Sequence, residues 1–162
     1  MATLERSGSV SVAELLSEDL IEADLKATNR EEVFERLVSD LADAGKVENP
    51  AEALQAIKER EDILSTGIGN GVAIPHAKTP AVDNLVAAFG RVKEGIDFQS
   101  LDGKPVHLIF LLISPQKEAG LHVRALARIS RMLKNIRFRN LLQDAETSEE
   151  ILNIIRDQEE QQ

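Results

Sequence analysis

The chain has 162 residues, of which 43% are hydrophobic and 29% are charged, and its formal net charge is −9 at pH 7. This size and composition fit one globular domain with a sizeable core, and the negative charge makes nucleic acid a poor partner. The lack of cysteine excludes disulfides and thiolate chemistry. The longest apolar run, Leu108 to Ile113, is far shorter than the roughly 20 residues of a membrane helix, and the first residues contain no apolar run of signal-peptide length. We therefore expect a cytoplasmic protein without membrane insertion.

The N-terminal segment predicts a short helix and a first strand. Residues 1–9 are expected to form a loose arm. Ser11 is a good N-cap for a helix that covers the apolar residues up to Leu16, and residues 20–25 are typical of a strand.

Two amphipathic helices follow this strand. Thr28-Asn29-Arg30-Glu31 has the pattern of a capping box, and the helical spacing of apolar residues continues until Gly45. Asn49-Pro50 predicts the start of the second helix, with Arg60 near its end. On the inner face of this second helix we expect Leu54, Ile57 and Ile63.

The second half of the chain carries the apolar strands. Strands are predicted over residues 85–92, 96–98 and 106–114, with Asp102-Gly103 as a turn before the last of them. From Leu121 the apolar spacing becomes helical. The inner face of that helix is predicted to carry Leu121, Ala125, Leu126, Ile129, Met132, Leu133 and Ile136.

Two shorter helices, over residues 138–142 and 148–155, are expected before a polar tail at 158–162. Helices before, between and after the strands predict a single α/β (α+β) domain over residues 1–162. In this domain, helices flank a mixed sheet that contains antiparallel strands.

Residues 65–78 concentrate turn-forming residues around one histidine. Asn70-Gly71 favours a tight turn between two short strands, the second of which covers residues 72–74. Pro75 is expected to end the strand pairing and to fix the direction in which His76 leaves it. Three glycines, Gly67, Gly69 and Gly71, would let backbone N–H groups approach a charged group closely.

Two nucleotide-binding motifs are excluded in this stretch. Gly67-x-Gly69 has Val72 where a dinucleotide fingerprint needs its third glycine, and no Gly-Lys-Ser/Thr follows for a P-loop. We therefore expect no nucleotide cofactor.

The three histidines have different contexts. His107 begins the most apolar strand, which favours a structural role. His122 lies on the apolar side of a helix in its first turn, which fits either an anion site at the helix N-terminus or a capping histidine without a ligand. His76 fits either a turn histidine or a nucleophile, and the shaped backbone before it favours the nucleophile.

Two blocks of the sequence resemble a known family. They are Arg60-Glu61-x-x-x-Ser65 continued by TGIGNGVAIPH as far as His76, and HVRALARISRML, from His122 to Leu133. The chain is similar to the fructose/mannitol and nitrogen-regulatory type (type 2) of EIIA domain in the bacterial phosphoenolpyruvate-dependent phosphotransferase system (PTS). The Gly-Ile-Gly-Asn-Gly loop, and the absence of an attached IIB or membrane IIC segment, make it most similar to stand-alone nitrogen-regulatory members.

The resemblance implies a phosphocarrier. His76 would be phosphorylated on Nε2 by an HPr-type phosphocarrier protein or its nitrogen-branch relative. It would then pass the group to a downstream IIB domain, or signal to regulatory targets such as a transporter or a kinase. His122 matches a histidine that contacts the phosphoryl group, and Arg60 matches an arginine near it. The loop that the resemblance places at the phosphate comprises Ser65, Thr66, Gly67, Gly69, Asn70 and Gly71.

This chemistry requires little from the protein beyond geometry. Transfer between two histidines needs an unprotonated nitrogen aimed in line and donors around the phosphoryl oxygens. A histidine pKa of about 6.5 leaves most of the nucleophile neutral at pH 7, and a hydrogen bond from Nδ1–H to a carbonyl would expose Nε2. Neither a metal nor another cofactor is expected.

A basic helix face accompanies the second block. The segment from Gly120 to Gln143 has no acidic residue, and Arg124, Arg128 and Arg131 recur at helical spacing. This face is either a solvated helix surface or a docking surface, with Arg124 and Arg128 nearest to His122.

Three functions remain open from the sequence. They are the phosphocarrier, a purely regulatory binding protein with phosphorylation-dependent partners, and a metal-dependent hydrolase that uses the histidines as ligands. The last is disfavoured because the three histidines lie far apart without a His-x-x-x-His motif.

Overall fold

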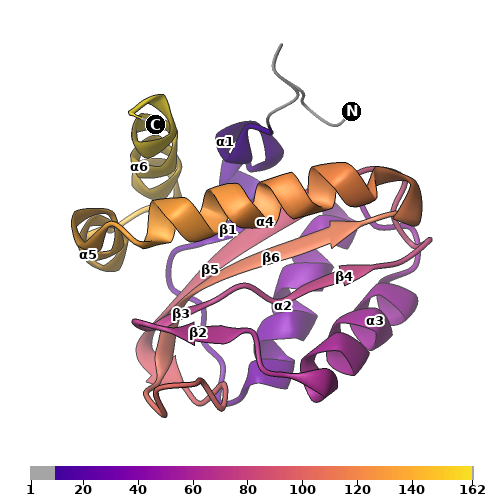
Figure 1. Cartoon of the computed structure of the whole chain (residues 1–162), viewed down its shortest axis with the longest axis horizontal. Coiled ribbons are helices and arrows are strands. Elements are labelled where there is room, and N and C mark those ends of the chain that lie inside the picture. Colours follow the sequence, from indigo (N-terminus) through magenta and orange to yellow (C-terminus); the bar gives the residue numbers. More distant parts are fainter. Residues whose placement is uncertain (1–9, 162) are drawn as a thin grey trace.

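The structure, a computed structural model, describes residues 10–161, so the expected arm at residues 1–9 and the last residue of the expected tail lie outside it. One mixed sheet is flanked by helices (Figure 1), which confirms the predicted fold class. The helices are α1 (Val12–Leu15), α2 (Arg30–Asp43), α3 (Pro50–Ile63), α4 (Ala119–Leu133), α5 (Ile136–Asp144) and α6 (Ser148–Glu160), with 3₁₀ turns η1 (Glu18–Leu20) and η2 (Gln116–Glu118). The strands are β1 (Ile21–Glu22), β2 (Gly67–Gly69), β3 (Val72–Ala73), β4 (His76–Lys78), β5 (Val86–Ile96) and β6 (Val106–Ser114).

The sheet is built around β6. Its strand order is β1-β5-β6-β3-β2, and β4 also pairs with β6. β5 runs antiparallel to β6, whereas β3 and β4 run parallel to it. Val72 lies beside Leu108 and His76 lies beside Leu112, so β3 and β4 follow one another along the same edge of β6.

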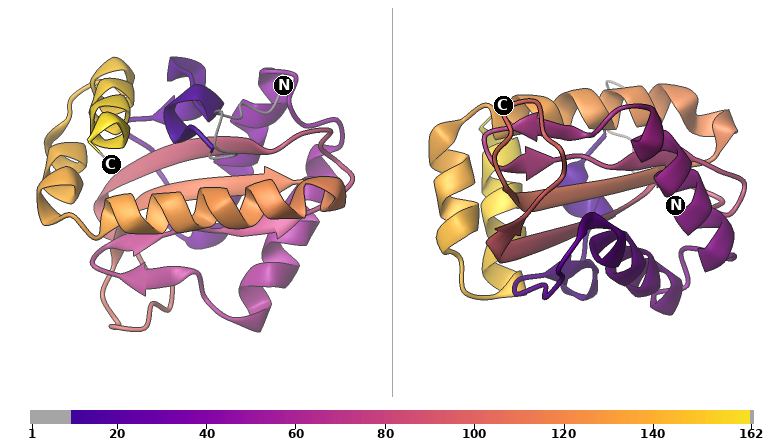
Figure 2. Two further views of the ribbon diagram at one scale, coloured as in Figure 1. Left: turned by 45° about the horizontal axis from the view of Figure 1, so that its top comes forward. Right: turned by 90° about the horizontal axis from the view of Figure 1, so that it is seen from below.

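Both faces of the sheet are covered. α4 lies in front of the sheet and α2 lies behind it in the left view of Figure 2. α4 packs on β6, α2 packs on β5, and α3 packs on both β4 and α2. This arrangement explains why β6 is a continuous apolar run, in which every residue except His107 is buried.

The Asn-Gly turn forms as predicted. β2 and β3 are antiparallel, and both Asn70 (φ 59°) and Gly71 (φ 77°) between them have left-handed backbone, which suits this residue pair. Pro75, however, only interrupts the pairing along β6. The pairing resumes at once, because His76 is the first residue of β4.

The first long helix begins one residue later than the capping box predicts. Asn29 is the N-cap, and its Oδ1 accepts from Glu32 N at 2.9 Å. Glu32, rather than Glu31, reaches back, and its Oε1 accepts from Thr28 N at 2.7 Å. Asn is as good an N-cap as Thr, and this register places a glutamate at the third helical position.

The start of α3 agrees with the prediction, but one residue of its inner face does not. Asn49 caps the helix, Ile57 is fully buried and Leu54 packs partly on the core. Ile63 is 80% exposed, because the helix ends there and the chain turns toward β2.

Three other element boundaries differ from the predictions. β1 has only two residues, and the two strands expected at 85–92 and 96–98 are one strand, β5, which ends at Ile96. Ile136 is 64% exposed rather than internal, because α4 ends at Leu133 and Asn135 caps a new helix, α5.

The expected polar tail is largely helical. α6 continues to Glu160, and the side chain of Glu159 is buried. Its carboxylate accepts from Val12 N at 2.7 Å and from Ala13 N at 2.8 Å, both at the start of α1. Arg128 Nε of α4 lies 2.8 Å from the same carboxylate. Glu159 thus joins the first and last helices of the described chain to α4.

Candidate functional site

His76 is held with one nitrogen occupied and the other free. Its Nδ1 lies 2.8 Å from the carbonyl oxygen of Ile74. A carbonyl can only accept, so Nδ1 carries the proton and Nε2 keeps its lone pair. The backbone is fixed by strand pairing with β6, including a hydrogen bond from Leu112 N to Pro75 O at 3.0 Å. The strand therefore aims an unprotonated Nε2.

His122 lies beside His76, although 46 positions separate them in the chain (122 − 76). The two ring centroids are 5.5 Å apart at an interplanar angle of 63°. His122 is buried, and its Nδ1 lies 2.6 Å from the hydroxyl oxygen of Ser114, the last residue of β6.

The structure places His122 in the first turn of α4, as the sequence predicts. η2 leads directly into α4, and Ala119 N donates to Gln116 O. His122 is the fourth residue of the helix. Its side chain, not the helix end, faces His76.

Both histidines lie in one pocket of about 470 Å³. The pocket also contains Arg60, whose Nη1 donates to Leu64 O at 2.9 Å at the end of α3. Three of the predicted site residues are therefore brought together from α3, β4 and α4. The full lining is Ala56, Glu59, Arg60, Ile63, His76, Ala77, Lys78, His122, Val123 and Leu126.

Lys78 belongs to this pocket and is not among the predicted site residues. It follows His76 by two positions on the same strand, so both side chains leave the same face of β4. The two-residue alternation of a strand beginning at His76 would have identified it.

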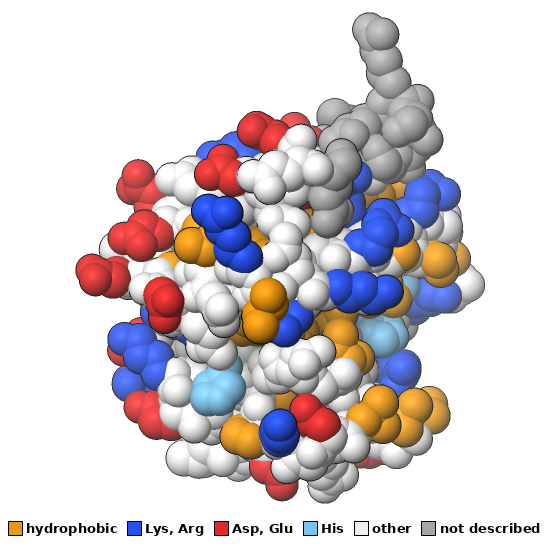
Figure 3. Space-filling model, turned by 60° about the vertical axis from the view of Figure 1, so that its left-hand side comes forward, with side chains coloured by type: hydrophobic (Ala, Val, Ile, Leu, Met, Phe, Trp, Pro, Cys, Tyr) orange, Lys and Arg blue, Asp and Glu red, His pale blue; other side chains and the backbone are white. Residues whose placement is uncertain are grey.

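The rim of the pocket is basic and apolar. Ile63 and Val123 are exposed, as is Leu64 next to the pocket. On the face drawn in Figure 3, a histidine at the right lies between Lys and Arg side chains and a group of hydrophobic ones. Such a rim favours contact with another macromolecule rather than with solvent alone.

Burial keeps both imidazoles neutral. It lowers the pKa of His76 below its ordinary value, against the opposing effect of the Ile74 carbonyl and with help from the nearby Arg60 charge. Burial, followed by repulsion from His76 and Lys78, lowers the pKa of His122 to about 4. At pH 7 the pair can therefore offer a lone pair on one ring and an N–H donor on the other.

The glycine loop adjoins this pocket without lining it, because Thr66 O accepts from Ile74 N at 3.1 Å, two residues before His76. None of Ser65, Thr66, Gly67, Gly69, Asn70 and Gly71 lines the pocket. The hairpin lies beside Leu108, four residues of β6 before Leu112 (112 − 108), or roughly 13 Å along the strand.

The glycines instead permit close packing of other loops. A side chain at Gly67 would collide with Ser100, and Asn70 N donates to Asp102 Oδ2 at 3.2 Å. Ordinary sequence patterns cannot distinguish a backbone shaped for a ligand from one shaped for a neighbouring loop.

The two loop hydroxyls are also engaged within the protein. Ser65 Oγ donates to Phe98 O and accepts from Gly67 N at 3.0 Å. Thr66 donates through its backbone N and its Oγ1 to the buried carboxylate of Glu61, both at 2.8 Å. Glu61 thus fixes the turn between α3 and β2, next to Arg60.

His107 takes part in packing at the hairpin end of the sheet. Its Nδ1 lies 3.0 Å from Val92 O, and a side chain at Gly95 would collide with its ring. These contacts agree with its interpretation as a structural residue.

The two arginines predicted to dock a partner differ. Arg124 is exposed, and its guanidinium folds back toward Gly120. Arg128 is partly buried in the ion pair with Glu159, which removes it from the free basic surface.

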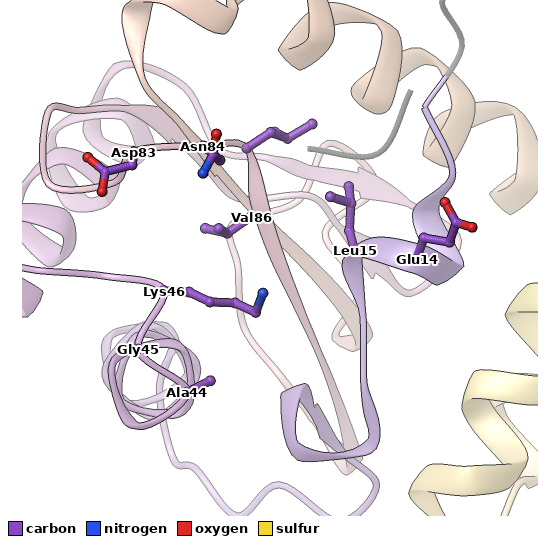
Figure 4. Close-up of a pocket in the computed structure, with 9 residues that line it drawn as sticks. Glu14, Leu15, Ala44, Gly45, Lys46, Asp83, Asn84 and Val86 are labelled. Carbon is purple, nitrogen blue, oxygen red and sulfur yellow. The ribbon is translucent and has the colours of Figure 1, made fainter. Parts of the chain in front are cut away.

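A second pocket, of about 250 Å³, lies between the ends of α1 and α2 and the start of β5 (Figure 4). Glu14, Lys46 and Asp83 are among its lining residues, and no histidine lines it.

Within residues 10–161 no group of three or more His, Asp or Glu side chains is placed to share a metal ion, so the hydrolase alternative gains no support. In the same residues no helix is long and apolar enough to span a membrane.

A family model described as "Phosphoenolpyruvate-dependent sugar phosphotransferase system, EIIA 2" matches residues 14–158. The chain belongs to this family. It is a PTS EIIA chain, which confirms the resemblance carried by the two sequence blocks.

The relatives of this EIIA chain include fructose-specific PTS components and nitrogen regulatory proteins. It is 40% identical over 146 residues to the fructose-specific EIIABC component of Bacillus subtilis, covering 90% of this chain but only 23% of that protein. It is 34% identical to the nitrogen regulatory protein of Bradyrhizobium diazoefficiens, covering 76% of this chain and 80% of that one. The crystal structure of the nitrogen regulatory protein IIA-Ntr from Neisseria meningitidis superposes with a TM-score of 0.83 at 30% identity, covering 89% and 98% of the two chains.

Proposed function

We propose that His76 accepts a phosphoryl group on Nε2 from an HPr-type phosphocarrier protein and passes it on. The observation that carries this proposal is the contact of His76 Nδ1 with Ile74 O, which leaves Nε2 as the free nitrogen in a pocket of donors. Membership in the EIIA family supports the phosphocarrier role.

The transfer of the phosphoryl group forms one N–P bond and breaks another. The lone pair of His76 Nε2 forms a new N–P bond while the N–P bond of the carrier's phosphohistidine breaks and returns its electron pair to the carrier. No proton has to leave His76, because Nδ1–H stays on the Ile74 carbonyl. That carbonyl stabilises the positive charge that the ring gains when Nε2 is phosphorylated.

Three side chains are placed to stabilise the transferred group. His122 donates to a phosphoryl oxygen, and Arg60 and Lys78 supply positive charge from α3 and β4. Phosphoryl transfer depends mainly on such positioning and charge neutralisation. The partner rests on the surrounding rim, with Arg124 as the cation that α4 still offers beside it.

Labelling with a phosphorylated HPr-type carrier tests this function. We expect an acid-labile phosphate on the native protein and none on His76→Gln. His122→Ala should fold and accept phosphate about 100- to 1000-fold more slowly, the range for loss of a transition-state donor. His107→Gln is the matched control, because it removes a histidine outside the pocket. Acid-labile label on His76→Gln would refute the assignment.

A second function is favoured by the nitrogen-regulatory relatives. In this reading the phosphorylation state of His76 selects regulatory partners, such as a transporter or a kinase, and the chain need not serve a sugar permease. Proteins retained by the phosphorylated form and by His76→Ala should then differ. Identical partners for both forms would leave only the carrier role.

The recipient and the setting are part of the same proposal. A downstream IIB domain is the recipient if the chain serves transport, and the reaction is then that of a cytoplasmic phosphotransferase component of the EC 2.7.1 type. Transfer from the phosphorylated chain to a separately prepared IIB domain would test this directly.

A further inference from the structure

Ser114 is a buried hydroxyl next to the reacting pair that the proposed function does not use. It is fully buried at the end of β6, and its Oγ lies 2.6 Å from His122 Nδ1. Its backbone pairs with Lys78 of β4, and its carbonyl accepts from Thr79 N at 2.9 Å. Ser114 is thus fixed to the strand that carries His76 and bonded to the ring of His122.

The hydrogen bond between Ser114 and His122 can run in either direction, and burial decides between them. If Nδ1–H donated to Oγ, the hydroxyl would need another acceptor for its own proton. Within residues 10–161 the Ser114 hydroxyl has its one hydrogen bond with His122. Because buried donors are almost always paired, the hydroxyl donates to an unprotonated Nδ1.

The proton of the neutral ring is then on Nε2. No hydrogen bond to Nε2 is found within the described chain, and Nε2 is not among its fully buried unpaired polar atoms. It therefore opens onto the pocket that His122 shares with His76.

We propose that Ser114 is a positioning residue, whose hydroxyl holds His122 as the Nε2–H tautomer that donates to the phosphoryl group. The two rings then have opposite tautomers. Ile74 O selects Nδ1–H on His76 and frees its Nε2 as the nucleophile, whereas Ser114 selects Nε2–H on His122 as the donor. The kinetic part of this inference rests on the proposed function, but the tautomer part does not.

The tautomer can be measured directly. Nitrogen NMR shifts of the native protein, with His122 assigned by its loss in His122→Ala, should show Nε2–H on His122 and Nδ1–H on His76. In Ser114→Ala the His122 signals should move toward a mixture of both tautomers. An Nδ1–H tautomer on native His122 would overturn the proposal, whatever the kinetics are.

Single-turnover phosphorylation tests the consequence. Ser114→Ala should lower the maximal rate about three- to tenfold, while the carrier concentration at half-maximal rate stays unchanged. Ser114→Thr, which keeps the hydroxyl, should restore the rate. Thr79→Val is the matched control, because it removes another buried hydroxyl, which accepts from Ala81 N at 3.2 Å instead of bonding to a histidine. Equal slowing by Ser114→Ala and Thr79→Val would reduce Ser114 to a packing residue.

Failure of the proposed function is distinguishable from failure of this inference. If native protein accepts no phosphate from the carrier, the proposed role of His76 falls while the tautomer result stands. If native protein is phosphorylated but His122 has the wrong tautomer, only the role of Ser114 falls.

Discussion

The chemistry of single residues in this pocket is set by what each nitrogen touches. A carbonyl on Nδ1 of His76 and a hydroxyl on Nδ1 of His122 assign opposite roles to two identical side chains. Burial keeps both rings uncharged near neutral pH, so neither role requires a protonated, charged imidazole.

The pH dependence of phosphorylation follows from His76. Only the unprotonated ring is nucleophilic, and burial lowers its pKa, so the rate should fall with decreasing pH with a midpoint below the ordinary histidine value of about 6.5. NMR titration of the His76 ring should give the same midpoint as the kinetic curve. Hydrolysis of the phosphorylated carrier, followed at each pH, is the control. A midpoint above the ordinary histidine value would contradict the role of burial.

Among the elements, α4 combines two functions along its length. Its first turns contribute His122 and Val123 to the pocket, and its outer face carries the exposed Arg124. Farther along, Arg128 is committed to Glu159. Arg131 is exposed again in the last turn, so the pairing of Arg128 interrupts the basic face that the sequence of this helix predicts.

Charge reversal of Arg124 tests this division of α4. Arg124→Glu should slow association with a phosphorylated carrier about three- to tenfold at about 0.01 M salt, where the screening length is about 30 Å. The effect should nearly vanish at about 1 M salt. Arg137→Glu is the control, because this exposed arginine lies on α5, beyond the other end of α4 (Figure 1). An equal effect of both substitutions would mean that net charge alone matters.

Across the whole molecule, local sequence patterns predict the bounds of only some helices and strands. The limits of β6 follow from its apolar run and the proline after it, and the start of α3 follows from Asn49-Pro50. Resemblance to the family supplied the pairing of His76 with His122, which no local pattern contains because it depends on β4 and α4 packing beside β6. The glycine loop illustrates the opposite case, in which the glycines of a strong local pattern permit packing against other loops and do not line the pocket.

Glu159 shows why the expected tail could not be interpreted from the sequence. The residues that it binds, Ser11 to Ala13, lie 146 to 148 positions away, and only folding brings them together. A charged residue near a polar end of the chain is typical of solvent exposure, yet here it is buried against α1 and α4.

Replacement of Glu159 should weaken the whole fold. In Glu159→Gln the side-chain NH₂ would face the N–H of Val12 or Ala13, donor against donor, and Arg128 would lose its partner. We expect urea unfolding to give a free energy of unfolding about 2 kcal/mol lower, with an unchanged dependence on urea. Glu160→Gln, an exposed neighbour with the same chemistry, should change it by no more than about 0.5 kcal/mol. Arg128→Met added to Glu159→Gln should recover part of the loss, because it removes the unpaired guanidinium. Equal stability of the two glutamine variants would show that the buried carboxylate does not hold the ends of the described chain together.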